Sequence, residues 1–297
     1  MGQFNLLDFC WDSRKDKVCW FSRNSCRRDF LENWNSFRFT KFKEVPSYLT
    51  QKELYQIRLK SFFAGISFEA TRGQKTLSEE ADRQRNPGEN AITDMLPVLK
   101  RSINVDFDTS IITWHLATSI CYHQDHDPNK PRSEDMKISK YLSNYIMYLL
   151  VMQPAMILPE HCGSFWFDHA LKKLRDTFSE PLDKTAAFNS LLQFRTDEPA
   201  LGKPSFEDPL EIAGLLATKL NQSSNKWELI KNMWIEMLLY AAHSCQHVNH
   251  VKQLGRYGRE FLTLIWIMGG YHVIEEVICK RETEGTCFNT LQFNDYI

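Results

Sequence analysis

The chain has 297 residues, of which 43% are hydrophobic and 25% are charged, and its formal net charge is −1. This composition is typical of a folded globular protein and excludes a wholly disordered chain. The small net charge excludes strong global attraction to nucleic acid, so we expect no nucleic-acid partner.

The first 43 residues form a basic segment, with nine Lys or Arg against five Asp or Glu. Such a segment can contact anionic lipid or an acidic partner. Its candidate contact residues are Arg23, Arg27 and Arg28. A solvated basic edge that contacts no partner is the alternative.

The cysteines and apolar stretches bear on the cellular compartment. The eight cysteines are scattered and form no C-x-x-C pair, as expected for small apolar residues of a reducing compartment. The first residues lack the pattern of a signal peptide. The longest apolar stretch, residues 145–159, contains Gln153 and Pro154 and is too short to cross a bilayer. We therefore predict a cytoplasmic protein, able to lie peripheral to a membrane, with no transmembrane helix in this chain.

Helical periodicity dominates the first half, and strand-like alternation is nearly absent. The pattern predicts an amphipathic helix over residues 49–65. A polar segment over 71–94, interrupted by glycine and by Asn-Pro-Gly, favours a flexible loop. Two segments, 108–123 and 139–153, are apolar on nearly every side, so we expect them to be helices in the middle of a bundle.

The second half continues the helical pattern. Further helices are predicted over residues 163–180, 208–222, 225–255 and 258–280. Asp208 and Pro209 suit the N-cap and the first position of a helix, and Gly255 suits a helix end. The stripe of the first of these helices consists of Phe167, Leu171, Leu174 and Phe178. The prediction is one all-α domain over 1–297, a compact multi-helix bundle of seven to nine helices with long connecting loops.

The first histidine cluster lies in the sequence WHLATSICYHQDHD, residues 114–127. His115 has apolar neighbours on its helix face, so we expect a buried, neutral histidine that is hydrogen-bonded. The remaining ligand-like residues of the cluster follow in a predicted loop: His123, Asp125, His126 and Asp127. Their chemistry suits zinc, but a solvated loop is the favoured interpretation.

The second histidine cluster lies in HSCQHVNH, residues 243–250. On one continuous helix His243, His247 and His250 would share a face, and Glu236 would extend it. Two histidines four residues apart can chelate a metal ion if a further ligand approaches, but the H-E-x-x-H order is absent. We expect a polar helix face, with a protein contact or a metal site as alternatives.

Several motifs also suggest kinship, and they run in order over nearly the whole chain. They are MGQFNLLDFC, VDFDTSIITWHLATSICYH, ISKYLSNYIMYLLVMQPAMILP, KLRDTF and WELIKNMWIEMLLYAA with the following KQLG. In these motifs the chain resembles a large plant family of uncharacterised membrane proteins that pair the domains of unknown function 4220 and 594. The resemblance implies that residues 44–180 correspond to the later part of the first domain and 208–280 to the second. It implies a fold and a setting rather than a reaction. The family's usual N-terminal membrane helices are not found in this sequence, so we expect either the cytosolic part of a longer protein or a soluble relative.

No nucleophile, P-loop or dinucleotide-binding motif stands out, and no cofactor is expected. The sequence favours a non-catalytic protein-interaction or scaffold module with an unknown protein partner. The basic front and the histidine-bearing side of residues 226–254 are the candidate contact surfaces. One alternative is a metal-dependent hydrolase that uses His243, His247 and His250. The other is a bundle that binds a small molecule or lipid between 108–123 and 139–153.

Overall fold

The computed structural model describes residues 2–13, 41–42, 71–85, 95–125, 131–157, 165–178, 183–193, 208–255 and 260–267. The protein is all-α, as predicted. Within the described residues ten α-helices have defined bounds and a further helix covers 261–267, so the prediction of seven to nine helices is too low. No helix in this part of the chain has the length and apolar content needed to cross a membrane.

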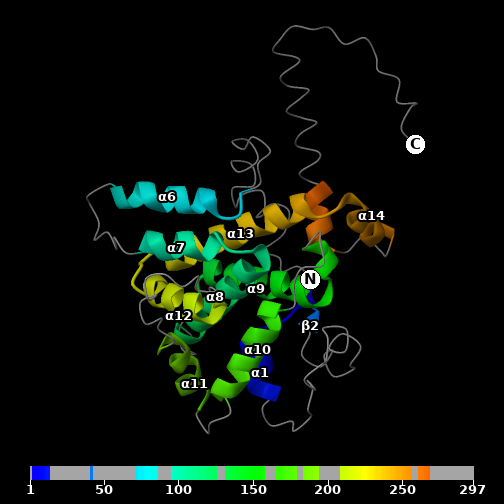
Figure 1. The fold of residues 1–297 in the computed structure, drawn as a ribbon. Coiled ribbons are helices and arrows are strands. Elements are labelled where there is room, and N and C mark those ends of the chain that lie inside the picture. Colours follow the sequence, from blue (N-terminus) through cyan, green and yellow to red (C-terminus); the bar gives the residue numbers. More distant parts are fainter. Residues whose placement is uncertain are drawn as a thin grey trace, which may run out of the picture.

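Helix α8, Phe107–Gln124, lies in the middle of the fold (Figure 1). Every residue from Phe107 to Cys121 is buried, which confirms the prediction of a helix enclosed on all sides. Helix α8 packs most extensively on α12, Pro209–Leu220. The thiol sulfur of Cys121 lies 3.9 Å from the carbonyl oxygen of Ala217, an approach that the small alanine permits. Helix α7, Met95–Ile103, covers another side of both helices.

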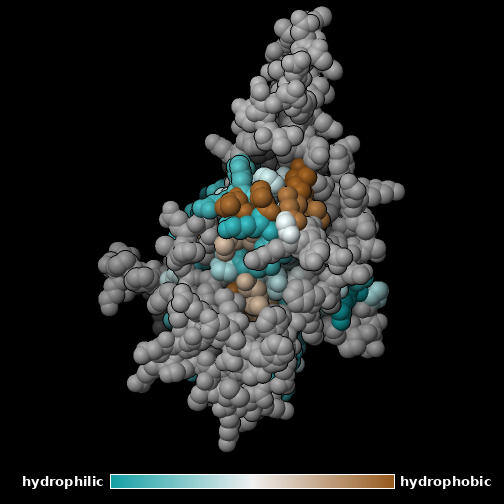
Figure 2. All heavy atoms as spheres, turned by 90° about the vertical axis from the view of Figure 1, so that its right-hand side faces the viewer, coloured by the Kyte–Doolittle hydropathy of each residue, from teal (hydrophilic) through white to brown (hydrophobic). Residues whose placement is uncertain are grey.

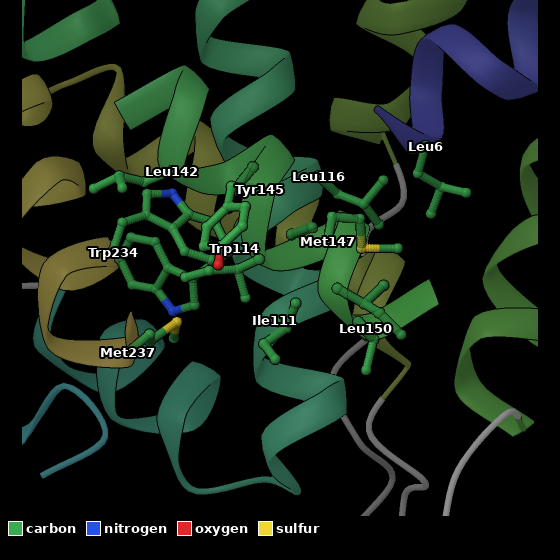
Figure 3. Packing of buried hydrophobic residues seen from close by; sticks show 14 of the residues in the cluster. Leu6, Ile111, Trp114, Leu116, Leu142, Tyr145, Met147, Leu150, Trp234 and Met237 are labelled. Carbon is green, nitrogen blue, oxygen red and sulfur yellow. The ribbon is translucent and has the colours of Figure 1, made fainter. Parts of the chain in front are cut away.

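Helix α9, Glu134–Met152, lies against α8 on one side and against α13, Lys226–Ser244, on another. The predicted stop at Pro154 is confirmed, because α9 gives way there to the short helix η3, Pro154–Met156. Large side chains of α8, α9 and α13, among them Trp114, Tyr145 and Trp234, meet in the same part of the core (Figure 3). The three helices therefore form the central framework of the fold.

The N-terminal residues belong to this framework, which the basic composition of the first 43 residues did not predict. Strand β1, Gly2–Gln3, pairs antiparallel with β2, Lys41–Phe42, and α1, Leu6–Ser13, follows. Phe4, Leu6 and Leu7 are at most 1% exposed. Gly2 lies so close to the ring of Tyr148 that a Cβ atom would overlap it. Residues 4–10 thus contribute to the hydrophobic core.

Helix α6, Gln74–Arg85, occupies part of the segment 71–94, so the prediction of a loop there is wrong for these residues. The residue that stabilises the start of α6 lies far away in the sequence. The Glu236 carboxylate of α13 accepts hydrogen bonds from the first backbone N–H groups of α6 and so satisfies donors that a helix start leaves unpaired. The polar composition alone did not reveal this partner. The helix predicted over 49–65 lies outside the described residues.

Helix α10, Phe165–Phe178, shows the predicted amphipathic pattern. All four residues of its stripe are buried: Phe167, Leu171, Leu174 and Phe178. The proline-rich stretch that follows contains two short helices that were not predicted, α11, Lys184–Ser190, and η4, Leu191–Gln193. Asp208 then caps α12 as predicted, with its side chain accepting from the backbone N–H of Leu210.

Candidate interaction surface

The long helix predicted over 225–255 is two helices, α13 and α14, His247–Gly255. Cys245 adopts an extended backbone with ψ 134°, which ends α13. Its thiol lies 4.0 Å from the sulfur of Met156, so the interruption lets Cys245 pack against η3. The expectation that His243, His247 and His250 share one face of a continuous helix is therefore wrong.

The three histidines have different surroundings. His243 and His247 are exposed, whereas His250 is 0% exposed. The Nε2–H of His250 donates to the carbonyl oxygen of Ala242 over 3.0 Å, and Nδ1 lies 3.1 Å from the Thr263 hydroxyl. The imidazole stacks on Trp266, with ring centroids 4.7 Å apart and planes 4° from parallel. Burial lowers the pKa of His250, so the ring is neutral. Because both of its nitrogens contact groups within the protein, His250 serves as a structural link.

Glu236, the other candidate metal ligand, is also 0% exposed. Its Oε1 accepts from the Thr71 hydroxyl at 2.6 Å and from the backbone N–H groups of Gly73 and Lys75 at 2.7 and 3.1 Å. Its Oε2 accepts from the hydroxyl and the backbone N–H of Thr76 at 2.9 and 3.0 Å. Five donors thus occupy the acceptor positions that a metal ion would need.

These placements do not bring together the residues that the alternative of a metal site in the second cluster would need. Glu236 holds the start of α6, and His250 holds α14 against 261–267, so neither side chain points to a shared ion. Among the residues that the structure describes, no three His, Cys, Asp or Glu side chains form a group able to bind a metal ion.

The residues of the first histidine cluster are also not brought together at one site. His115 is buried, as expected, and it joins two elements: Nε2 accepts from the backbone N–H of Leu6 at 3.0 Å, and Nδ1 lies 2.9 Å from the Ser143 hydroxyl. Because Nε2 is an acceptor, the ring proton sits on Nδ1. Burial lowers the pKa of His115 to about 3, and the Lys140 ammonium acts in the same direction. The ring is neutral at physiological pH.

The remaining members of that cluster have structural partners where they are described, and His123 lies within α8 rather than in the predicted loop. The His123 ring contacts Phe188, with centroids 4.6 Å apart. The Asp125 carboxylate accepts from the Lys226 ammonium and from the Trp227 indole N–H, each at 2.8 Å. His126 and Asp127 lie outside the described residues, as do the basic candidates Arg23, Arg27 and Arg28.

One surface that the sequence did not single out carries exposed apolar side chains. Val248 is 51% exposed, Val251 58%, Leu254 41%, and Leu264 in the helix over 261–267 is 41% exposed. We call these four residues the α14 face. Figure 2 looks onto the side of the molecule that carries α14 in Figure 1, and hydrophobic residues gather there next to hydrophilic ones. Exposed apolar clusters of this kind mark contact sites more often than scattered single residues do.

The helix that carries Leu264 is anchored to α9 by a carboxylate. The Tyr145 hydroxyl donates to Glu260 Oε1 at 2.5 Å and accepts from the backbone N–H of Leu262 at 2.8 Å. Gln153 donates to Glu260 Oε2 at 3.2 Å. Burial and the Glu260 carboxylate raise the pKa of Tyr145 well above its ordinary value, so the phenol keeps its proton and remains a donor. These bonds fix the position of residues 260–264.

Helix α14 is anchored in the same region. The Asn249 side chain donates to the carbonyl oxygen of Ala155 in η3 at 2.8 Å, and the Gln253 side chain donates to Gln153 at 2.9 Å. Together with the stacked pair of His250 and Trp266, these contacts leave α14 little freedom to turn its apolar side inward. The α14 face is therefore a preorganised surface.

Comparison with known proteins identifies one family in this region. The family model described as a protein of unknown function, DUF594, matches residues 219–272. The match includes α13, α14 and the helix over 261–267, and hence the whole α14 face. The domain of unknown function 4220 is not detected in the chain. No curated protein and no solved structure matches.

Proposed function

We propose that this chain is a non-catalytic protein-interaction or scaffold module whose contact surface is the α14 face. The supporting observation is the exposure of this face while hydrogen bonds to α9 and η3 hold it in position. A partner that covers the face would remove apolar surface from water, which contributes roughly 25 cal/mol per Å² buried. A preorganised surface also loses little conformational entropy on binding.

The proposed setting is the plant cytosol at the periphery of a membrane. The match of DUF594 to residues 219–272 supports the terminal part of the proposed relationship to proteins that pair the domains 4220 and 594. The likeness of residues 44–180 to domain 4220 rests on the motifs within 105–123, 138–159 and 173–178. In this setting the basic N-terminal segment would contact anionic lipid, and the α14 face would contact the partner.

The two alternative functions lack a supporting contact. A hydrolase would need His243, His247 and His250 to converge with a carboxylate, but His250 and Glu236 are held by other groups. For a lipid site between α8 and α9, the direct contact of His115 with Ser143 offers no support.

Site-specific photocrosslinking tests the proposal. A photoreactive amino acid is placed at position 251, and a matched control carries it at Ser78, an exposed position on α6. In plant extract, position 251 should yield a crosslinked protein that mass spectrometry identifies reproducibly, and position 78 should not. Equal yields from both positions, or no product from position 251, would contradict the proposal.

A further inference from the structure

We infer that α6 is a conditional helix, which folds only while it is docked on α13 and which opens while the rest of the bundle stays folded. The inference goes beyond the proposed function, and its failure would leave the proposal for the α14 face unaffected. It follows from the composition of α6, from the position of its contacts along α13, and from the origin of the hydrogen bonds in its first turn.

Helix α6 buries little apolar surface. It lies at one edge of the described helices, next to α7 and α13 (Figure 1). Its twelve residues include two apolar ones, Leu77 and Ala81, and both are partly exposed. Helix α8, by contrast, is buried at every residue from Phe107 to Cys121. Because apolar burial is the main favourable term in folding, α6 should open at a much lower free energy than α8.

Two carboxylates of α13 hold the two ends of α6. Glu236 accepts hydrogen bonds from the first turn, and Glu228 accepts from the Arg83 side chain in the last turn at 3.1 Å. Just before α6, the Arg72 guanidinium lies over the ring of Tyr240, 5.7 Å from its centroid. Since Glu228, Glu236 and Tyr240 are eight and four residues apart, they lie along one side of α13, and α6 runs antiparallel to that side.

The first turn of α6 depends on α13 for its hydrogen-bond acceptor. The residue before the helix is Gly73, which has no side chain that could cap it. The Glu236 carboxylate supplies this function and accepts from the backbone N–H groups of Gly73, Lys75 and Thr76. A polar helix of twelve residues is marginal on its own in water. When these donors lose Glu236, α6 should therefore unfold as it leaves α13.

Opening of α6 changes what α13 presents to solvent. It would uncover the carboxylates of Glu228 and Glu236 and the side chain of Met233, against which Gly73 lies. A ligand that binds the released segment or this side of α13 would shift the equilibrium towards the open form by mass action. Helix α6 is thus a local order–disorder switch on the framework.

Native-state hydrogen exchange of the full-length protein tests the inference. The amides of residues 78–83 in α6 should be protected, but at least roughly hundredfold less than those of residues 111–121 in α8. Urea is then added at concentrations well below the unfolding midpoint. Exchange in α6 should respond only weakly to urea, because its opening exposes little surface, whereas exchange in α8 should accelerate strongly.

A conservative variant links the opening to Glu236. Thr76→Val keeps the shape of the side chain but removes a hydroxyl that donates to the Glu236 carboxylate at 2.9 Å. It should accelerate exchange in residues 78–83 by about tenfold and leave their weak urea dependence unchanged. The control is Thr218→Val on α12, where the exposed hydroxyl donates to the carbonyl oxygen of Gly214 in its own helix. This control should not alter exchange in α6.

Three results would overturn the inference. If residues 78–83 share both the protection and the urea dependence of residues 111–121, α6 opens only when the whole protein unfolds. If residues 78–83 have no protection even without urea, α6 is not docked as a helix. If Thr76→Val leaves exchange in α6 unchanged, the contact with Glu236 does not control the opening.

Discussion

Helices α13 and α14 are consecutive in the chain, yet they meet their surroundings in opposite ways. Eleven of the nineteen residues of α13 are buried, including the carboxylate of Glu236, whereas His250 is the one buried residue among the nine of α14. Helix α13 is part of the framework, and α14 is held on the framework by a few polar side chains. The contrast separates residues that maintain the fold from residues whose side chains stay exposed to solvent.

The largest effect on stability is expected at Glu236, in the buried helix. Glu236→Gln keeps the volume but replaces one oxygen that accepts hydrogen bonds with an amide that faces the donors of α6. We expect a loss of about 3 kcal/mol in the free energy of unfolding, measured with urea. The control is Glu228→Gln on the same helix, where the carboxylate is 40% exposed and pairs with Arg83, and the loss there should stay within about 1 kcal/mol. Similar losses in both variants would contradict the assigned role of Glu236.

His115, the buried histidine of α8, should make the free energy of unfolding depend on pH. Its folded-state pKa of about 3 lies below that of an unfolded histidine, which is 6.5. His115 therefore contributes stability that is present above the unfolded pKa and is lost as the pH falls towards the folded pKa. From about pH 7.5 to about pH 5 this contribution should fall by about 2 kcal/mol.

The variant His115→Gln isolates this contribution. It should be less stable than the wild type at neutral pH, yet it should lose less stability on acidification, as followed by urea unfolding at both pH values. An unchanged pH dependence would show that protonation of His115 does not oppose folding.

Substitution of Gly73, next to α6, should have a smaller effect on the free energy of unfolding. Gly73 has φ +107°, and a Cβ atom there would lie 2.5 Å from the sulfur of Met233 on α13. Gly73→Ala should thus cost about 1.5 kcal/mol, through both backbone strain and crowding. Gly255→Ala, at the end of α14 where a Cβ atom meets nothing within 4 Å, should cause no loss. Thermal unfolding of the pair tests the difference, and an unaffected Gly73→Ala would argue against tight packing of α6 on α13.

Helices of the fold could be predicted from the sequence where a local pattern of residues indicates them. Helix α8 has apolar residues on every side, and a helix of that kind has to be enclosed. The Asp208 cap and the apolar stripe of α10 are likewise local patterns. Helix α6 could not be predicted in this way, because the carboxylate that supports its first turn lies about 160 residues away in the sequence.

The candidate surface was predicted only in part. The sequence indicated the right end of the chain, but the break at Cys245 has no glycine or proline to mark it and depends on packing against Met156. Without the break, His250 appeared to share a polar face with His243, whereas it is buried. The exposure of Val251 depends on how distant parts of the chain pack around α14. The sequence pattern of α14 alone does not contain that information.

The most direct test of the α14 face is the unfolding free energy of Val251→Asp in the full-length chain. Placing a carboxylate where the valine is 58% exposed should change this free energy by less than about 0.5 kcal/mol, as at other uncovered surface positions. A loss above about 2 kcal/mol would mean that the folded chain itself covers the face, because a buried unpaired charge is strongly destabilising, and the face would then not be open to a partner.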